Sequence, residues 1–290
     1  MTGRYEMDAA PWPAPAKLNL FLHITGRRPD GYHELQTVFQ FLDYGDDISF
    51  STRADGEIRR TGGDYGIDAD DDLVLRAARS LQEKSGTNLG ADVAVSKRIP
   101  MGGGLGGGSS DAATVLVALN SLWGAGLSVD KLAAIGLQLG ADVPVFVRGH
   151  AAWAEGVGEK LAPVDPPEDW FLILHPGCHV PTGRIFNDPD LTRNTPPITI
   201  RDFLKGAVHN DCEPVVFAAF PEVAAAARWL RERSGDVRMT GTGACLFARC
   251  RDRDQAAAIA AEIPAPWQGF AARAVNRSPL LCRLEQEAGA

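Results

Sequence analysis

A glycine-rich loop at residues 100–113 constrains this chain more than any other stretch of its sequence. Six of the seven residues from 102 to 108 are glycine, so the backbone can adopt positive φ angles and approach a bound group closely. Apolar residues at helical spacing follow the loop, which predicts a helix. Three residues suited to capping its start precede them: Ser109, Ser110 and Asp111. Because unpaired N–H groups and the helix dipole attract anions, the sequence predicts a phosphate-binding loop.

Three other interpretations of the loop compete with this one. It does not end in Gly-Lys-Ser/Thr, so it is not a phosphate loop of the Walker type. Gly102, Gly104 and Gly107 fit the G-x-G-x-x-G pattern of dinucleotide-binding folds. However, residues 97–100 separate them from the preceding apolar alternation, where such folds need a tight turn. A flexible linker is disfavoured because the loop runs directly into an apolar-faced helix.

Composition limits the class of protein. At 290 residues the chain can bury one large core or two ordinary ones, and we expect two. A hydrophobic fraction of 45% and a charged fraction of 23% are typical of a soluble globular protein. No apolar run has the length of about 18 residues that predicts a membrane span. Residues 1–13 lack the basic and apolar regions of a secretory leader, so we expect a cytoplasmic protein without a membrane partner.

Charge and cysteine content limit the partners. The net charge is −8, from 29 basic and 37 acidic side chains, which disfavours nucleic acid as a partner. The five cysteines lack C-x-x-C spacing, which argues against a zinc site and against a disulfide framework. Any phosphate group must therefore be bound by local interactions rather than by the overall field of the protein.

Apolar and polar residues alternate over residues 14–24, which predicts a strand with Lys17 and Asn19 on one face. Residues 48–60 predict a β-hairpin that turns at Asp55-Gly56. Taken alone, a lysine and an asparagine on a strand are most often a solvated face.

Two signals delimit a helix over residues 129–139: a capping serine at 128 and a terminating glycine at 140. Residues 143–147 predict a strand after it, and Asp142 lies in the turn between the two elements. Such an aspartate is often a turn residue that binds its own backbone. Prolines at 163, 166 and 167 give the strongest linker signal. We therefore predict an N-terminal domain of residues 1–162 and a C-terminal domain of residues 163–290.

The sequences of four segments resemble motifs of the GHMP kinases, the family of galactokinase, homoserine kinase and mevalonate kinase. Pro-Ala-Lys-Leu-Asn at 15–19 is similar to the first motif of the family, and the glycine loop is similar to the second. Gly-Ala-Asp-Val-Pro at 140–144 is similar to the catalytic segment, and Thr-Gly-Thr-Gly at 240–243 to the third motif. The resemblance implies a two-domain α+β fold with the active site in the cleft between the domains. Most members carry Ser-Ser where this chain has Gly107 and Gly108.

An ATP-dependent kinase that uses Mg²⁺ is the activity that the resemblance implies. Lys17 and Asp142 are its predicted catalytic residues, the first near the transferred phosphate and the second at the attacking hydroxyl. No protein ligand of Mg²⁺ is predicted, because glycine replaces the serine that other members place in the loop. Asp72 stands where relatives commonly carry asparagine. The implied ATP-binding residues are Lys97, Pro100, Met101, Gly102, Gly103, Gly104, Leu105, Gly106, Gly107, Gly108, Ser109, Ser110 and Asp111.

Asp-Gly-Tyr-His-Glu-Leu at residues 30–35 is similar to one branch of the family, whose substrate carries a cytidine diphosphate group. In that branch the tyrosine stacks on cytosine and the histidine reads its edge. The implied substrate-binding residues are Asn19, Tyr32, His33, Thr182, Phe186, Gly241, Thr242 and Gly243. Two alternatives are a GHMP kinase for a small alcohol, such as homoserine or mevalonate, and a nucleotide-binding sensor without catalysis. We expect a monomer or a homodimer.

Overall fold

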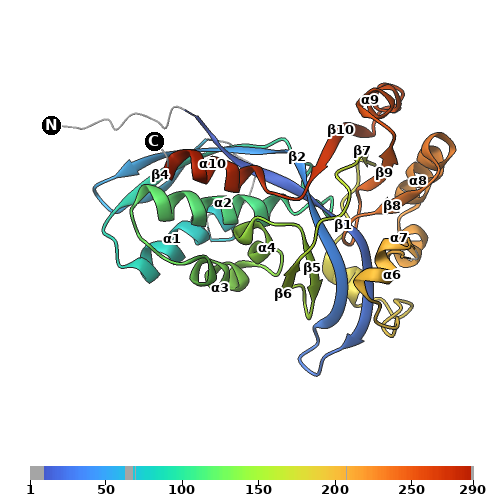
Figure 1. The fold of residues 1–290 in the computed structure, drawn as a ribbon, viewed down its shortest axis with the longest axis horizontal. Coiled ribbons are helices and arrows are strands. Elements are labelled where there is room, and N and C mark those ends of the chain that lie inside the picture. The colour runs from blue at the N-terminus through green and yellow to red at the C-terminus, as the bar shows by residue number, and fades with distance from the viewer. Residues whose placement is uncertain (1–9, 63–67, 69, 207, 289–290) are drawn as a thin grey trace.

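The computed structural model describes residues 10–62, 68, 70–206 and 208–288. Two long strands, β1 (Trp12–Arg27) and β2 (His33–Arg53), form an antiparallel pair along most of their length. In Figure 1, β1 starts in the left half of the molecule, passes its middle and ends at a hairpin that projects downward, and β2 returns from this hairpin to the left half. Residues of both strands therefore contribute to both halves of the structure.

The first half, residues 10–163, is a sheet with helices on one side. After β1 and β2 it consists of β3 (Ile58–Gly62), α1 (Leu73–Ser85), β4 (Gly90–Ser96), α2 (Gly107–Leu122), α3 (Val129–Leu139), α4 (Val143–Arg148), β5 (Ala152–Glu155) and β6 (Lys160–Pro163). The strand order is β3-β4-β2, and α1 to α4 gather below these strands in Figure 1. Phe41, Phe50 and Leu81 are completely buried between sheet and helices, so this layer has its own core.

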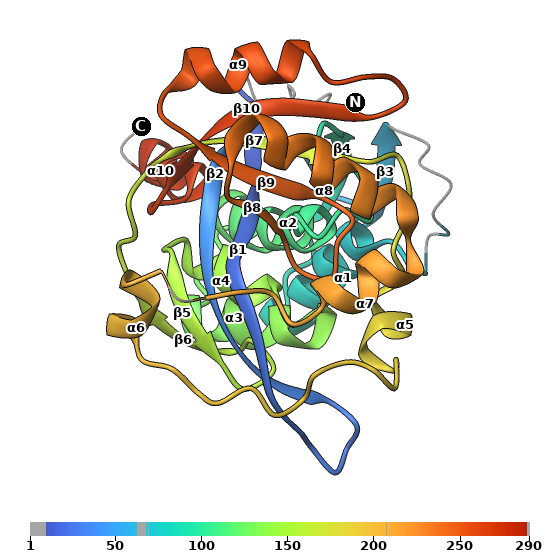
Figure 2. The ribbon, with the colours of Figure 1, turned by 90° about the vertical axis from the view of Figure 1, so that its right-hand side faces the viewer.

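The second half, residues 170–275, is an antiparallel sheet covered by helices. It consists of β7 (Trp170–His175), α5 (Thr182–Phe186), α6 (Ile200–Leu204), α7 (Glu213–Ala219), α8 (Pro221–Ser234), β8 (Val237–Met239), β9 (Leu246–Cys250), α9 (Arg253–Ala261) and β10 (Gln268–Val275). The strand order is β10-β7-β9-β8. Helices α8 and α9 pack against the outer side of these strands (Figure 2). No helix in the described ranges is both long enough and apolar enough to cross a membrane.

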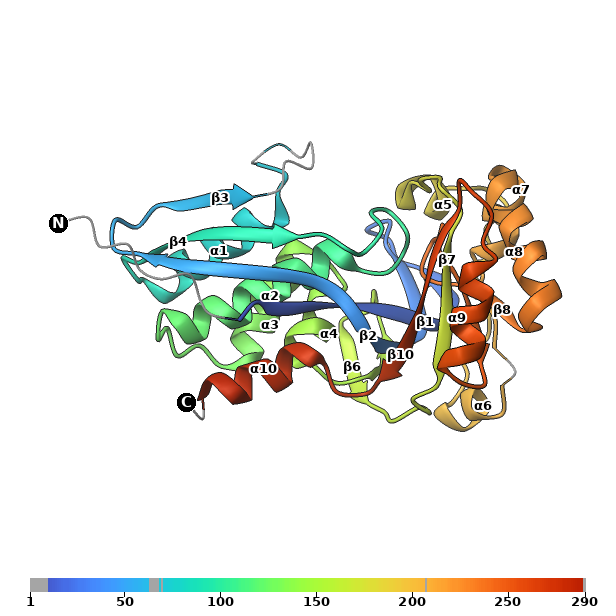
Figure 3. The same ribbon diagram turned by 90° about the horizontal axis from the view of Figure 1, so that it is seen from above.

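Paired strands and a shared core join the two halves. Strand β10 pairs with β2 at Phe41 and Leu42, which connects both sets of strands. The last helix, α10 (Pro279–Ala288), returns to the first half, as Figure 3 shows. There Leu280 enters the core, and the Arg283 guanidinium lies 4.7 Å from the centre of the Trp12 ring. The predicted boundary after residue 162 falls inside β6 and stays a prediction.

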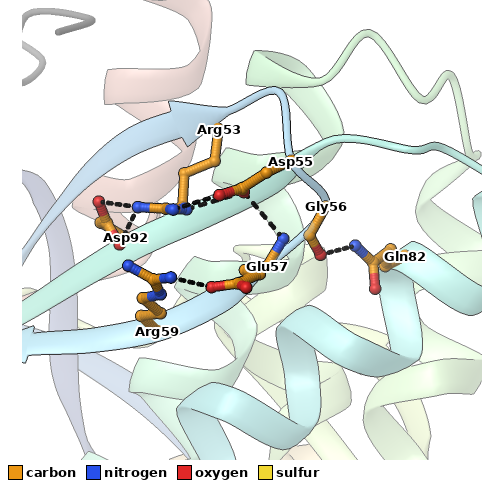
Figure 4. A network of polar contacts seen from close by, with 7 residues as sticks. All are labelled: Arg53, Asp55, Gly56, Glu57, Arg59, Gln82 and Asp92. Atoms are coloured by element: carbon orange, nitrogen blue, oxygen red, sulfur yellow. Dashed lines mark hydrogen bonds and ion pairs between the residues drawn. The ribbon is translucent and has the colours of Figure 1, made fainter. Parts of the chain in front are cut away.

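The predicted hairpin over residues 48–60 is wrong. Strand β3 pairs in parallel with β4, and β4 lies between β3 and β2. Polar contacts hold the turn in this arrangement (Figure 4). Arg53 donates to Asp92 of β4 at 3.0 Å and also binds Asp55 in the turn, while Gln82 of α1 donates to the Gly56 carbonyl at 2.8 Å. These contacts with β4 and α1 direct the chain away from β2, which a local turn signal cannot foresee.

Candidate active site

The glycine loop lies between strand β1 and a second glycine turn at residues 240–243. The backbone N–H of Lys17 donates to the Leu105 carbonyl at 2.9 Å. Thr240 Oγ1 donates to the Gly104 carbonyl at 3.1 Å. Gly104 has a φ of +77°, and a Cβ at this residue would lie 2.2 Å from the Thr240 carbonyl oxygen. Only glycine allows the two loops to approach this closely, so the segments similar to the second and third family motifs meet here.

Helix α2 begins earlier than predicted, and its start is open to a ligand. Its first residue is Gly107 and its N-cap is Gly106, which has a φ of +74°. Within the described part of the chain, no side chain caps this helix. The prediction that Ser109, Ser110 and Asp111 cap it is therefore wrong, because they lie inside the first turns. The N–H groups of an uncapped first turn are available to an anion.

A cavity of about 390 Å³ opens beside this helix start. All of the predicted ATP-binding residues line it except Ser110, which is buried inside α2. Arg60 and Asp72 also line it, and neither was predicted as a site residue. Asp72 Oδ1 accepts the Val74 N–H at 2.9 Å as the N-cap of α1, and the same carboxylate pairs with Arg60. The carboxylate in place of the usual asparagine thus serves a helix cap and an ion pair.

Lys97 joins two buried carboxylates at the entrance to the glycine loop. Its Nζ lies 2.8 Å from Asp111 Oδ2 and also contacts Asp46. Asp46 Oδ1 accepts the N–H of Arg98 at 2.5 Å and that of Ile99 at 2.8 Å. Burial raises the pKa of Asp111, and the Lys97 ammonium opposes this rise. The cluster therefore anchors the segment that leads into the loop.

The predicted catalytic residues, Lys17 and Asp142, are in contact. Lys17 Nζ lies 3.2 Å from Asp142 Oδ2. The same ammonium donates to Asn19 Oδ1 at 2.5 Å and to the Gly104 carbonyl at 3.1 Å. The Lys17 side chain is buried, whereas 33% of the Asp142 side chain is exposed. The accessible carboxylate is suited to accept a proton, and the fixed ammonium beside it is suited to stabilise negative charge.

Asp142 precedes a helix, not the strand that was predicted for residues 143–147. Pro144 fits the first turn of α4 because the N–H that proline lacks has no partner there. The β-branched residues after Asp142 favoured a strand, but the helix buries them against α2 and α3, and this packing overrides their propensity. The Asp142 side chain does not cap α4. Its carboxylate is therefore available to Lys17.

A second cavity, of about 540 Å³, adjoins the first. Gly104, Gly106 and Ser109 line both cavities. Lys17 and Asp142 line the second, so the predicted catalytic pair lies where the two spaces meet. The second cavity also collects seven of the eight predicted substrate-binding residues: Asn19, Tyr32, His33, Thr182, Phe186, Gly241 and Thr242. Gly243 lies in the adjoining turn and is not part of the lining.

Two rings from different halves of the chain stack in the second cavity. His33 is the first residue of β2, and Phe186 is the last of α5. Their ring centres lie 5.1 Å apart with the planes at 21°. The neighbouring Tyr32 is 64% exposed, which leaves its ring accessible to a ligand. That Tyr32 and Phe186 enclose one base stays a prediction.

Sequence reasoning missed two polar residues that hold the site in place. Asn210 Nδ2 donates to the Met239 and Gly241 carbonyls, both at 2.8 Å, and so fixes the second glycine turn. Arg193 Nε donates to His33 Nε2 at 3.1 Å, across 160 positions of the sequence. Neither residue carries a local signal beyond membership of a polar run between apolar segments.

The donor atoms at the glycine loop fit a magnesium ion that is bound mainly by phosphate. Over the described ranges, no three or more His, Cys, Asp or Glu side chains gather as a metal site. Ser110 Oγ and Asp111 Oδ1 are buried without a hydrogen-bond partner in the same ranges. Mg²⁺ typically keeps several waters and takes one or two carboxylates together with substrate phosphates. A site with few protein ligands therefore suits it.

Comparison with known proteins identifies the class to which this fold and site belong. Residues 72–150 match the GHMP kinases N terminal domain, and residues 199–269 match the GHMP kinases C terminal domain. Together with relatives of more than half identical sequence, these matches show that the chain belongs to the GHMP kinase family. The predicted family, the α+β fold and the activity of an ATP-dependent kinase are confirmed.

Two similar proteins share one name, 4-diphosphocytidyl-2-C-methyl-D-erythritol kinase. The protein from Alkalilimnicola ehrlichii is 58% identical, with 95% of this chain and 94% of the relative covered. The protein from Halorhodospira halophila is 56% identical, with coverage of 96% and 97%. A crystal structure of 4-(cytidine 5'-diphospho)-2C-methyl-D-erythritol kinase matches with a TM-score of 0.79 and 33% identity. That match covers 91% of this chain and 98% of the solved one.

Proposed function

We propose that this chain transfers the γ-phosphoryl group of ATP to the 2-hydroxyl of 4-diphosphocytidyl-2-C-methyl-D-erythritol, in isoprenoid precursor biosynthesis. The position of the Lys17–Asp142 pair supports this proposal most strongly. The pair lies where the first cavity, at the glycine loop, meets the second cavity, which aromatic side chains line. The first cavity suits phosphate groups, and the second suits a stacked base. The name shared by the relatives supports the same substrate.

ATP binding rests on the open start of α2. The first-turn N–H groups and the glycine backbone would bind the phosphates, because no side chain of the described residues caps this helix start. Mg²⁺, when bound, would neutralise part of the charge on the phosphates. Asp111 would hold it, because Asp111 lines the first cavity and its Oδ1 is buried without a hydrogen-bond partner among the described residues.

Phosphoryl transfer then needs positioning and charge compensation more than covalent chemistry. The exposed part of the Asp142 carboxylate would orient the substrate hydroxyl and accept its proton as the oxygen attacks the γ-phosphorus. A new O–P bond forms, the bond between the γ-phosphorus and the bridging oxygen of ADP breaks, and ADP leaves. Lys17 would stabilise the charge on the transferred group, since three oxygen acceptors fix its ammonium at this point.

The second cavity favours a cytidine substrate over a small alcohol. A volume of about 540 Å³ falls in the usual range for ligand sites, roughly 300 to 1,000 Å³. Tyr32, His33 and Phe186 offer ring faces that homoserine or mevalonate has no group to use. A nucleotide sensor without catalysis is disfavoured, because binding alone does not require the Lys17–Asp142 contact.

We further propose that the protein acts in the cytoplasm, where ATP is available, as a monomer or a homodimer. Its partner is the small cytidine diphosphate substrate rather than nucleic acid. The net charge of −8 supports the last point, since it repels a polyanion.

Phosphorus NMR of the reaction products tests the proposed function. The chain is incubated with MgATP and the cytidine diphosphate substrate, and we expect ADP together with one new phosphomonoester on the 2-hydroxyl, the diphosphate remaining intact. Appearance of inorganic phosphate without the monoester would indicate an ATPase. Loss of the substrate diphosphate signal would indicate a different reaction at the same cavity.

A further inference from the structure

Arg193 lies in the segment between α5 and α6, and its guanidinium is fixed by the surrounding backbone. Nη2 donates to the Phe186 carbonyl at 2.9 Å and to the Asp188 carbonyl at 2.6 Å. Nη1 donates to the Leu191 carbonyl at 3.1 Å. Three backbone acceptors thus set the plane of the guanidinium and leave its Nε–H pointing in one direction. They also tie Arg193 to Phe186, whose ring lines the second cavity.

The remaining bond of this guanidinium goes to His33. Nε of Arg193 lies 3.1 Å from Nε2 of His33. Because a guanidinium has only donors, Nε2 of the imidazole must act as the acceptor. The imidazole is then neutral, and its single proton resides on Nδ1. Burial lowers the pKa of His33, and the charges of Arg193 and Arg27 lower it further, which agrees with a neutral ring.

We propose that Arg193 is a positioning residue that sets the base specificity of the second cavity by holding His33 as the neutral tautomer protonated on Nδ1. The ring then offers the bound base a hydrogen-bond donor. This inference rests on the proposed function and deepens it, because it assigns the choice of base to a residue outside the cavity lining. His33 is well placed for such a role, since it is 8% exposed and its ring is stacked on Phe186.

The chemistry of the two pyrimidines explains how a tautomer selects between them. Cytosine has an unprotonated N3 that accepts a hydrogen bond, whereas N3 of uracil carries a hydrogen and donates. A donor on His33 therefore pairs with cytosine and opposes uracil. Without Arg193 the imidazole can move its proton to Nε2, and Nδ1 then becomes an acceptor that suits uracil. Stacking cannot make this distinction, because every base has a π face.

The kinetic test compares kcat/KM for the cytidine substrate with kcat/KM for its uridine analogue. In Arg193→Met, which keeps side-chain length but removes every donor, we expect this ratio to fall about tenfold, the worth of about one hydrogen bond. Arg193→Lys retains a cationic donor, so its ratio should lie between those of Arg193→Met and wild type. Arg184→Met is the matched control, since the Arg184 guanidinium lies over the Phe220 ring at 5.0 Å, and its ratio should equal that of wild type.

The second readout is the nitrogen NMR spectrum of the imidazoles in protein labelled with ¹⁵N-histidine. The chain has six histidines, and the His33 signals are assigned from their loss in His33→Gln. We expect wild-type His33 to show a protonated Nδ1 and an unprotonated Nε2, and Arg193→Met to show protonation shifting to Nε2. A merely structural role of Arg193 would lower the use of both nucleotides equally and leave the tautomer unchanged.

Two results would overturn the inference: an unchanged cytidine-to-uridine ratio in Arg193→Met, or a wild-type His33 that is protonated on Nε2. If Arg193→Met does not fold, the ratio in Arg193→Lys and the wild-type spectrum still decide. Failure of wild type to phosphorylate the cytidine substrate would instead contradict the proposed function. The spectrum would then still report whether Arg193 fixes His33, so the two failures can be told apart.

Discussion

The side chain of Asp142 lies at the N-terminus of α4 but does not cap that helix. Its carboxylate can therefore interact with other groups. A capping aspartate would direct its oxygens to backbone N–H groups. Here one oxygen lies 3.2 Å from Lys17 Nζ, and part of the side chain reaches the second cavity. The geometry therefore supports a role in chemistry over the turn role that an aspartate after a glycine most often has.

We expect Asp142→Asn to lower turnover at least about a hundredfold, because the amide keeps the shape but cannot accept a proton. ATP affinity should change little, since Lys17 keeps its bonds to Asn19 Oδ1 and the Gly104 carbonyl. Single-turnover kinetics and calorimetry with ATP measure the two quantities. A fall in turnover of less than about tenfold would rule out the base role.

We expect Tyr32→Ala and Phe186→Ala each to raise KM for the cytidine substrate by about one to two powers of ten, the usual worth of a base stacked on an aromatic ring. KM for ATP should stay nearly constant, since neither side chain lines the first cavity. Steady-state kinetics with each substrate varied in turn tests this. Unchanged KM for the cytidine substrate in both variants would show that the rings do not hold the base.

Among single residues, sequence reasoning found the two side chains that are proposed to act in catalysis but not the residues that hold the site in place. Lys17 and Asp142 lie in segments whose sequences resemble family motifs, and the structure brings the two side chains into contact. Asn210 and Arg193 act through bonds to residues far away in the chain, so no local pattern marks them. Residues of this kind emerge only when the fold is known.

Among the elements, the start of α2 depends on the backbone conformation of Gly106. Gly106 has a φ of +74°, and a Cβ there would lie 2.9 Å from Phe146 Cζ and 3.0 Å from Lys17 Cε. A side chain at this position is therefore strained in itself and also collides with Lys17.

We expect Gly106→Ala to weaken ATP binding by more than about tenfold, because roughly 1–2 kcal/mol of backbone strain acts at the phosphate loop. Turnover should fall as well, since Lys17 must move. Gly124→Ala is the control: it has a φ of +62° at the other end of α2, with nothing within 4 Å of the added Cβ. Calorimetry should show ATP affinity preserved in the control. Equal loss of affinity in both variants would mean that strain in α2, not the loop itself, governs binding.

The buried cluster at the loop entrance should matter for stability as well as for ATP. We expect Asp46→Asn to lower the free energy of unfolding by about 1–3 kcal/mol, because a buried charge-assisted contact to Lys97 is lost. Asp47→Asn is the matched control, since its half-exposed carboxylate pairs loosely with Arg98 at 3.5 Å and should change stability by less than about 0.5 kcal/mol. Denaturant titration measures both. Equal stability of the two variants would mean that the cluster does not anchor the loop.

Elements with strong end signals were predicted well, and elements decided by packing were not. Helix α3 spans Val129–Leu139 as predicted, because Ser128 and Gly140 mark its ends. Helix α4 was mistaken for a strand, since its valines favour strands until neighbouring helices bury them. The hairpin over residues 48–60 failed for a related reason, because β4 comes later in the sequence and takes the edge of β2.

In the whole molecule, the candidate active site lies where the two halves share structure. Strands β1 and β2 carry Lys17, Asn19 and His33, while the second half supplies Phe186 and the second glycine turn. Composition and the proline-rich linker predicted two domains. They could not predict that α10 returns to the first half or that both long strands serve both cores, because these contacts join residues far apart in the chain.

The substrate assignment is tested most directly by kcat/KM for ADP release with three alcohols at saturating MgATP: 4-diphosphocytidyl-2-C-methyl-D-erythritol, homoserine and mevalonate. We expect the cytidine substrate to be used at least about a hundredfold more efficiently than either small alcohol. Only the cytidine substrate fills the second cavity and pairs with the polar groups that line this cavity. Equal or better use of homoserine or mevalonate would contradict the assignment and make the protein a GHMP kinase for a small alcohol.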